Sequence, residues 1–148
     1  MTHTIFIASD HAGFDLKAVL TKHLSEIGHG VVDKGAFEKN ESDDYPDFVT
    51  AAAQAVAENP GSRGIVIGGS GQGEAICANR VKGIRAALYY GGNTEIIKLS
   101  REHNDSNIFS LGARFISIEE AKEAVSLWLT IPFSNDERHV RRIAKLDK

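Results

Sequence analysis

The chain has 148 residues, of which 42% are hydrophobic and 25% are charged, and its net charge at pH 7 is −3. This composition is ordinary for a single globular domain over 1–148, and no cluster of Lys and Arg points to a nucleic-acid-binding protein. The single cysteine, Cys77, excludes an internal disulfide framework and favours a reducing compartment.

The N-terminal sequence MTHTIFIASDHAG has neither the cationic region nor the long apolar region of a signal peptide. No apolar run reaches the roughly 18 residues that a membrane-spanning helix needs. We therefore predict a cytoplasmic protein with no membrane partner.

Apolar runs and helical patterns alternate from the start of the chain. Residues 4–9 (TIFIAS) are typical of a buried strand, and apolar residues at helical spacing follow over 14–27. Gly28 is suited to end that helix, and the short run 29–35 predicts a second strand. A polar loop then leads to Pro46, a favoured first residue of a helix.

The same alternation continues to the C-terminus. The helix that begins at Pro46 is rich in alanine and stops at the turn 59–61 (NPG). The later strands are predicted at 63–69, 83–90 and 107–112. The later helices are predicted to begin near Gly73 and Asn93 and then to cover 118–129 and, after a break at Pro132, 135–147. Strands separated by helices predict right-handed βαβ units, and hence a three-layer α/β/α sandwich around a parallel sheet of about five strands.

Polar residues follow several of the predicted strands. In an open parallel sheet, ligands bind at the carboxyl ends of the strands, and a cluster of titratable groups there is typical of a catalytic site. The candidates that we expect on this rim are Asp10, His11, Ser70, Glu74, His103, Asn104, Gly112 and Arg114.

The glycine-rich loop GGSGQGE at 68–74 fits neither common nucleotide-binding motif. A dinucleotide-binding GxGxxG that began at Gly69 would need glycine where Glu74 stands, and no Lys–Ser/Thr pair follows Gly73 as in a P-loop. The loop is either a tight turn or a set of unpaired backbone amides at the N-terminus of a helix.

Glu74 is accordingly either an ordinary acidic residue of the first helical turn or a general base beside an oxyanion hole. A carboxylate next to backbone amides suits the removal of a C–H proton beside a carbonyl. The base takes the proton and the amides hold the enediolate.

The histidines leave a second interpretation open. His103 is either structural or catalytic, and a metal site could include Asp10, His11, His103 and Asp105. Their spacings match no metal-binding motif, so we predict no metal.

The C-terminal segment carries two arginines at helical spacing. Arg138 and Arg142 lie four residues apart, so on a helix both guanidinium groups face the same way and can hold one dianion. The alternative is a solvated basic face. The segment lies so far from the sheet in sequence that we expect it to pack at a subunit interface.

The acidic loop 38–47 is predicted to be solvated. Asp44 is placed to cap the helix that follows, and Tyr45 is placed to line a pocket. We assign no chemistry to this loop.

Six motifs, in order along nearly the whole chain, resemble the ribose-5-phosphate isomerase B family, which also contains the galactose-6-phosphate isomerase subunits. They are SDHAG (9–13), DYP (44–46), GGSGQGEAICAN (68–79), SREHNDSN (100–107), LGAR (111–114) and RHVRR (138–142). The resemblance implies a Rossmann-like fold and a cofactor-free, metal-free interconversion of ribose 5-phosphate and ribulose 5-phosphate through an enediolate. It also implies a homodimer or tetramer whose active sites are shared between subunits.

The resemblance further implies a role for each matched residue. Glu74 resembles the base that moves a proton between C2 and C1, in the branch of the family that does not use a cysteine at the position of Gly68. Cys77 lies too late in the chain to replace that cysteine, so we expect it to be packed on a helix. In the proton transfer, the resemblance implies that Ser70 moves a proton between O1 and O2 and that the amides of Gly69, Gly71 and Gly73 form the enediolate hole.

Around the sugar, it implies that His103 opens the ring, that Asp10 contacts sugar hydroxyls and that Asn104 positions the oxyanion. The implied phosphate-binding residues are His11, Arg138 and Arg142, with a contribution from Arg114.

Three alternatives stay open from the sequence. The substrate could be another aldose phosphate, such as allose 6-phosphate or a tetrose phosphate. The chain could instead be a nucleotide-binding α/β module without catalysis, or a metal-dependent hydrolase that uses Asp10, His11 and His103. The roles of His139 and Arg141 are left open.

Overall fold

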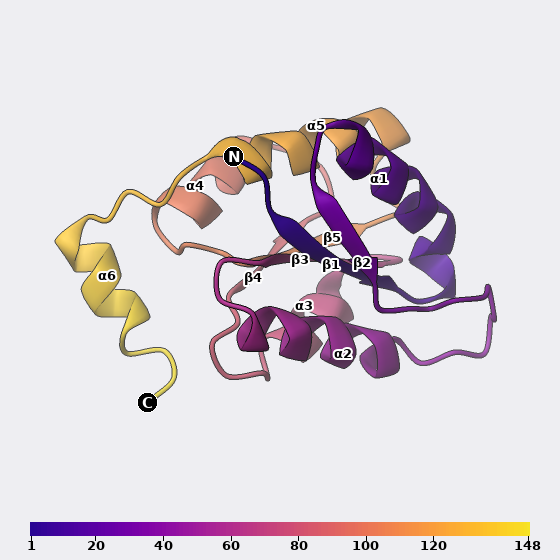
Figure 1. Cartoon of the computed structure of the whole chain (residues 1–148), viewed down its shortest axis with the longest axis horizontal. Helices are drawn as coiled ribbons and strands as arrows, with labels where there is room; N and C mark the ends of the chain where they lie inside the picture. The colour runs from indigo at the N-terminus through magenta and orange to yellow at the C-terminus, as the bar shows by residue number, and fades with distance from the viewer.

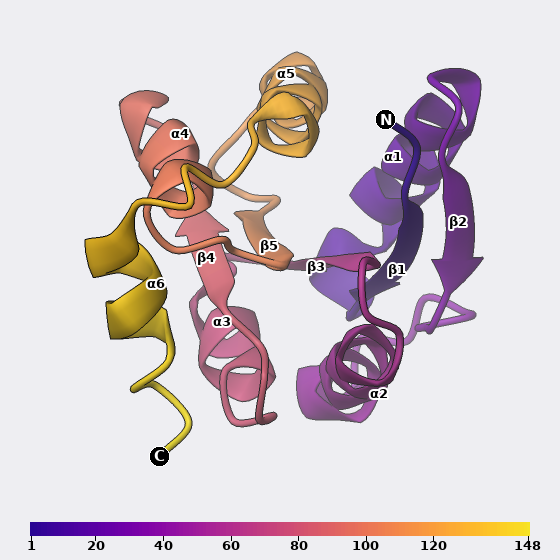
Figure 2. The same ribbon diagram turned by 60° about the vertical axis from the view of Figure 1, so that its left-hand side comes forward.

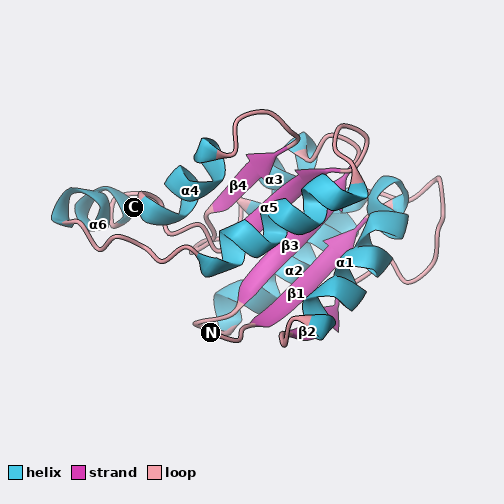
Figure 3. Cartoon of the chain, turned by 90° about the horizontal axis from the view of Figure 1, so that it is seen from above, coloured by secondary structure: helices cyan, strands magenta, loops and turns pink.

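Five short aliphatic runs form one all-parallel sheet in the computed structural model, which describes residues 1–148. The strands are β1 (Thr4–Ser9), β2 (Gly30–Asp33), β3 (Arg63–Gly68), β4 (Ala86–Tyr89) and β5 (Ile108–Gly112). Their spatial order is β2-β1-β3-β5-β4, with the long central strands crossing the middle of the view in Figure 3. β3 is buried at every position after the first and β5 at every position, as a parallel sheet covered on both faces requires.

Helices cover both faces of this sheet. One face carries α1 (Phe14–Glu26), α4 (Glu95–Glu102) and α5 (Ile118–Thr130), and the other carries α2 (Tyr45–Glu58) and α3 (Gln72–Ala78) (Figures 1 and 2). The core of the first face includes Trp128, which is fully buried and stacks on Phe109 with ring centroids 5.1 Å apart. The core of the second face is built from small residues of α2, such as Ala52 and Ala53. The predicted three-layer α/β/α sandwich is confirmed.

The ends of the elements agree with the local signals at most positions. Gly28, just after α1, has a φ of +98°, and Pro46 lies in the first turn of α2. The prediction that Asp44 caps α2 is wrong, because its side chain accepts no capping hydrogen bond. The edge strands β2 and β4 are shorter than predicted, since each pairs with a neighbour on one side only.

The C-terminal helix α6 (Glu137–Ile143) lies outside both layers, beside α4 (Figure 2). It is shorter than the predicted 135–147: Asp136 caps its start, and it ends at Ile143. Val140 on α6 and Leu146 beyond it are 46% and 62% exposed. No helix combines the length and apolar character that crossing a membrane requires.

The connections that follow β1 and β3 lie on opposite faces of the sheet. The chain leaves β1 for α1 on one face and leaves β3 for α3 on the other, although the two strands are neighbours. In doubly wound sheets, ligands bind in the crevice at the carboxyl ends of the two strands at such a switch point. Asp10 follows β1 there, and the glycine-rich loop follows β3.

Candidate active site

The loop between β3 and α3 has backbone amides without acceptors inside the chain. The N–H groups of Gly69, Ser70, Gly71 and Gly73 donate no hydrogen bond to the backbone or to a side chain. Gly71 has a φ of +77°, which favours glycine, and its carbonyl accepts a 2.6 Å hydrogen bond from the hydroxyl of the buried Ser110. The Ser70 hydroxyl accepts a 3.2 Å hydrogen bond from the amide of Gln72. These hydrogen bonds hold the loop in one conformation, and its unpaired backbone N–H groups are available to bind an anion.

Glu74 lies beside this loop with a buried carboxyl group. Its side chain is on the first turn of α3, and the residue is 4% exposed. Burial raises the pKa of Glu74, and the nearby charge of Asp10 raises it further. The carboxyl lies against Gly68, so that a Cβ on Gly68 would overlap it. A buried carboxylate with a raised pKa is suited to accept a proton.

Arg114 and Tyr45 pack against the glycine loop. The amide of Arg114 donates to the carbonyl of Gly69 at 3.0 Å, and a Cβ on Gly69 would lie 3.1 Å from Arg114 Nη1. The phenol of Tyr45 lies on the loop as well, where a Cβ on Gly73 would meet its oxygen at 2.7 Å. Tyr45 therefore packs against the glycine loop, and its lining of a pocket stays a prediction.

Asp10 and His11 complete the crevice at the end of β1. Asp10 Oδ1 accepts hydrogen bonds from the amides of Ala12 at 2.9 Å and Gly13 at 3.3 Å, which caps the short 3₁₀ turn η1 (His11–Gly13). His11 Nδ1 lies 2.7 Å from Oδ1 of Asp43. This hydrogen bond, with the charge of Asp10, raises the pKa of His11.

Asp43 is a residue of the site that the sequence interpretation missed. The loop 38–47 was predicted to be solvated, but the Asp43 side chain is only 8% exposed. Nothing near it in the sequence distinguishes this carboxylate from its exposed neighbours, since its partner His11 lies 32 residues earlier.

His103 and Asn104 do not lie on this rim, so the prediction that they converge there with the other candidates is wrong for one chain. They precede β5, whose first residue, Ile108, pairs with Gly64 near the start of β3. The carbonyl of Asn104 accepts a 2.9 Å hydrogen bond from Arg85 Nε, just before β4. Residues before a parallel strand lie at its amino edge, and the length of β5 alone, at 3.3 Å per residue, separates that edge from the glycine loop by about 13 Å.

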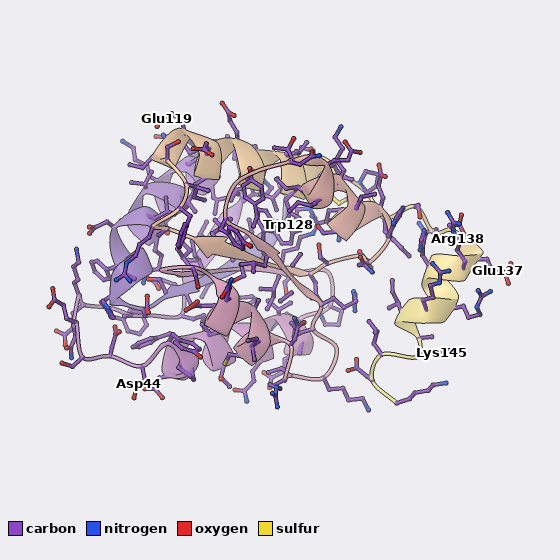
Figure 4. The ribbon with its side chains drawn as sticks, turned by 180° about the vertical axis from the view of Figure 1, so that it is seen from behind. Asp44, Glu119, Trp128, Glu137, Arg138 and Lys145 are labelled. Atoms are coloured by element: carbon purple, nitrogen blue, oxygen red, sulfur yellow. The ribbon has the colours of Figure 1, made fainter.

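The arginines of α6 lie at the same end of the molecule as His103. His103 stacks on His139 of α6 with ring centroids 4.2 Å apart, and Arg138 and Arg142 belong to that helix. Burial lowers the pKa of His139, and the neighbouring His103 lowers it further. Figure 4 shows Arg138 and Asp44, the neighbour of Asp43, on opposite sides of the molecule. The predicted site residues therefore form two groups: a rim group at the carboxyl ends of β1, β3 and β5, and an end group on α6 and before β5.

The residues able to bind a metal ion lie in the rim group. Asp10, His11 and Asp43 each offer a ligand atom within 4.8 Å of the others. The hydrogen bonds of Asp10 to amides and of Asp43 to His11 already account for this cluster, so we assign no metal to it. The ligand set of Asp10, His11 and His103 is not assembled within one chain, because His103 belongs to the end group.

The chain matches the family model described as Ribose/Galactose Isomerase over residues 5–146. It is 45% identical to ribose-5-phosphate isomerase B of Mycolicibacterium paratuberculosis, over 94% of this chain and 86% of that protein. It is 43% identical to ribose-5-phosphate isomerase B of Mycobacterium tuberculosis, over 94% of this chain and 85% of that protein.

Solved structures of similar proteins share the whole fold. Ribose-5-phosphate isomerase B of Clostridium thermocellum superposes with a TM-score of 0.91 at 43% identity, covering 97% of this chain and 95% of that one. Ribose-5-phosphate isomerase B of Mycoplasma genitalium, solved with bound ribulose-5-phosphate, superposes with a TM-score of 0.92 at 39% identity, covering 97% of this chain and 93% of that one.

Proposed function

The chain belongs to the ribose/galactose isomerase family and is an isomerase, and we propose that it interconverts D-ribose 5-phosphate and D-ribulose 5-phosphate through an enediolate. The similar proteins of known structure include one that holds ribulose-5-phosphate, which supports a sugar-phosphate substrate for this chain. Glu74 is the base in this proposal, and neither a metal nor a cofactor takes part.

One observation carries the assignment of the base: a buried carboxylate lies beside a row of backbone amides that have no acceptor. Burial raises the pKa of Glu74 toward the operating pH, and a carboxylate with a raised pKa is a stronger base for taking a proton from carbon. The amides can hold negative charge on the substrate oxygens at the moment it forms.

The reaction then proceeds by moving one proton between two carbons. The carboxylate of Glu74 takes the proton from C2 of the open-chain aldose, and the electron pair forms a C1=C2 double bond with negative charge on O1. The amides of Gly69, Gly71 and Gly73 stabilise that charge. Ser70 moves a proton between O2 and O1, and Glu74 returns its proton to C1 to give the ketose.

The separation of the rim and end groups supports an active site made by two chains. A single rim holds Glu74, Asp10 and His11 but no arginine from α6, and a phosphate dianion is best held by several cationic donors. In a two-fold homodimer the end group of one subunit can face the rim of the other. His103, Asn104, Arg138 and Arg142 would then reach the substrate from the partner chain.

A direct assay tests this function. Purified protein should isomerise ribose 5-phosphate in excess EDTA, and Glu74→Gln should lower kcat about 10²–10⁴-fold while substrate still binds. The exposed Glu58, changed to Gln, serves as the matched control and should retain full activity. Substantial turnover by Glu74→Gln would overturn the base assignment. A higher kcat/KM for allose 6-phosphate or a tetrose phosphate would overturn the substrate but not the chemistry.

A further inference from the structure

The carboxylate of Asp43 is buried, and its hydrogen bonds go to one residue only. Oδ1 lies 2.7 Å from His11 Nδ1 and accepts a second hydrogen bond from the His11 amide at 3.2 Å. Oδ2 is buried and has no partner. Burying a carboxylate with one unsatisfied oxygen costs folding free energy, and the only hydrogen-bond partner that this carboxylate gains in return is His11. This cost favours a functional reason for the contact.

The loop that carries Asp43 is built to hold it in place. The side chain of Asn40 accepts a 3.0 Å hydrogen bond from the amide of Ser42, and the carbonyl of Asn40 accepts one from the amide of Asp43 at 3.0 Å. Two residues later, Tyr45 lies against Gly73 of the glycine loop. The loop therefore joins His11 at the end of β1 to the loop that follows β3.

We propose that Asp43 is a positioning residue: it holds His11 with Nδ1–H toward Asp43 and Nε2 toward the phosphate of the substrate. This inference rests on the proposed function and on the phosphate-binding role that the family resemblance implies for His11. Asp43 touches His11 and not the substrate, so its effect passes through the imidazole.

Two consequences of the contact favour phosphate binding. The hydrogen bond at Nδ1 fixes the ring orientation, so Nε2 points away from Asp43 and stays available for a second partner. The negative charge favours the imidazolium form, in which Nε2 carries a proton that it can donate to a phosphate oxygen. The charged groups that face His11 are Asp43, Asp10 and Arg114, and the two carboxylates outweigh the one cation.

Nuclear magnetic resonance of the imidazole nitrogens tests the positioning directly. In the wild-type protein, ¹⁵N spectra of His11 should show a protonated Nδ1, and inorganic phosphate should shift the Nε2 resonance. Asp43→Ala should leave a neutral ring without a fixed Nδ1–H and should abolish the response to phosphate. Asp43→Asn keeps an acceptor but no charge, so it should preserve the Nδ1–H form while weakening the response. Spectra are recorded in EDTA, and Glu41→Ala, an exposed carboxylate of the same loop, should leave them unchanged.

Kinetics test the same contact through a double-mutant cycle. Asp43→Ala should lower kcat/KM about tenfold to a hundredfold, chiefly through KM, because a charge-assisted hydrogen bond is lost. In a His11→Ala background, adding Asp43→Ala should change kcat/KM by about twofold or less.

Two results would overturn the proposal. One is a wild-type His11 whose Nδ1 carries no proton under working conditions. The other is an additive loss in the double mutant, which would give Asp43 a role independent of His11. A protein that fails to isomerise ribose 5-phosphate but keeps the Nδ1–H form and the phosphate response would refute the proposed function alone. If a substituted protein unfolds, the wild-type spectra still decide the question.

Discussion

The carboxyl group of Glu74 occupies the space that a side chain on residue 68 would fill. A Cβ built on Gly68 overlaps that carboxyl, although Gly68 is the last residue of β3 and Glu74 lies on α3. The glycine at the end of the strand therefore makes room for the proposed base, and the two positions cannot both carry large groups.

We expect Gly68→Ala to displace the Glu74 carboxyl and to lower kcat about 10²–10⁴-fold, the range for loss of a general base. Circular dichroism should show the fold retained. Gly30→Ala is the control, since a Cβ there meets nothing within 4 Å and should leave kcat unchanged. Wild-type activity in Gly68→Ala would show that the carboxyl need not lie against β3.

The raised pKa of Glu74 predicts the acid side of the pH–rate profile. The base must be ionised to work, so kcat/KM should fall as the pH drops through the raised pKa, at a midpoint above the ordinary value of 4.5. Initial rates from about pH 4 to about pH 9 locate that midpoint. A midpoint at or below 4.5 would contradict the assignment.

The same shift predicts how stability depends on pH. Between 4.5 and the raised pKa, the folded state keeps the Glu74 proton that the unfolded state has lost, so stability falls as pH rises through this window. Glu74→Gln removes the buried charge and should raise Tm relative to wild type at about pH 8, with the difference fading toward about pH 4. Glu58→Gln should show no such pH-dependent gain, and an equal gain in both variants would contradict the buried-charge explanation.

Mixing subunits tests whether each active site uses two chains. Glu74→Gln damages the rim group and Arg142→Ala the end group, so in the proposed homodimer each variant alone should be inactive. Randomly reassembled mixtures should recover about a quarter of wild-type activity, since half of the dimers are mixed and one site in each is intact. Two rim variants, Glu74→Gln and Ser70→Ala, serve as the control pair and should recover nothing. Absence of recovery in the first mixture would place each site within one chain.

The ring-opening role that the family resemblance implies for His103 predicts an effect that depends on the direction of the reaction. Ribose 5-phosphate is mostly a closed furanose, whereas ribulose 5-phosphate has no free 5-hydroxyl and stays open. His103→Asn should therefore lower kcat at saturating substrate about 10²-fold or more with ribose 5-phosphate, as expected for a lost general acid–base catalyst, and much less with ribulose 5-phosphate. The value of kcat/KM should fall by the same factor in both directions, because the equilibrium constant does not depend on the enzyme. Equal losses of kcat at saturating substrate in both directions would show that His103 acts on the proton transfer itself.

The local features of this protein can be read from its sequence because they depend on short-range chemistry. The alternation of apolar runs and helical patterns predicts the sandwich, and the six motifs identify the family. The glycine-rich loop and Glu74 lie within a few residues of each other, so their association in one crevice needs no long-range information.

Only the tertiary structure decided which distant residues meet. His11 and Asp43 are 32 residues apart, and their pairing depends on how the loop before α2 folds back over the end of β1. Strand direction decided the position of His103, because in a parallel sheet the residues before a strand and those after it lie at opposite edges. The sequence by itself determined the elements and the chemistry-bearing residues. Their division into a rim group and an end group follows from the packing of the parallel strands and of α6.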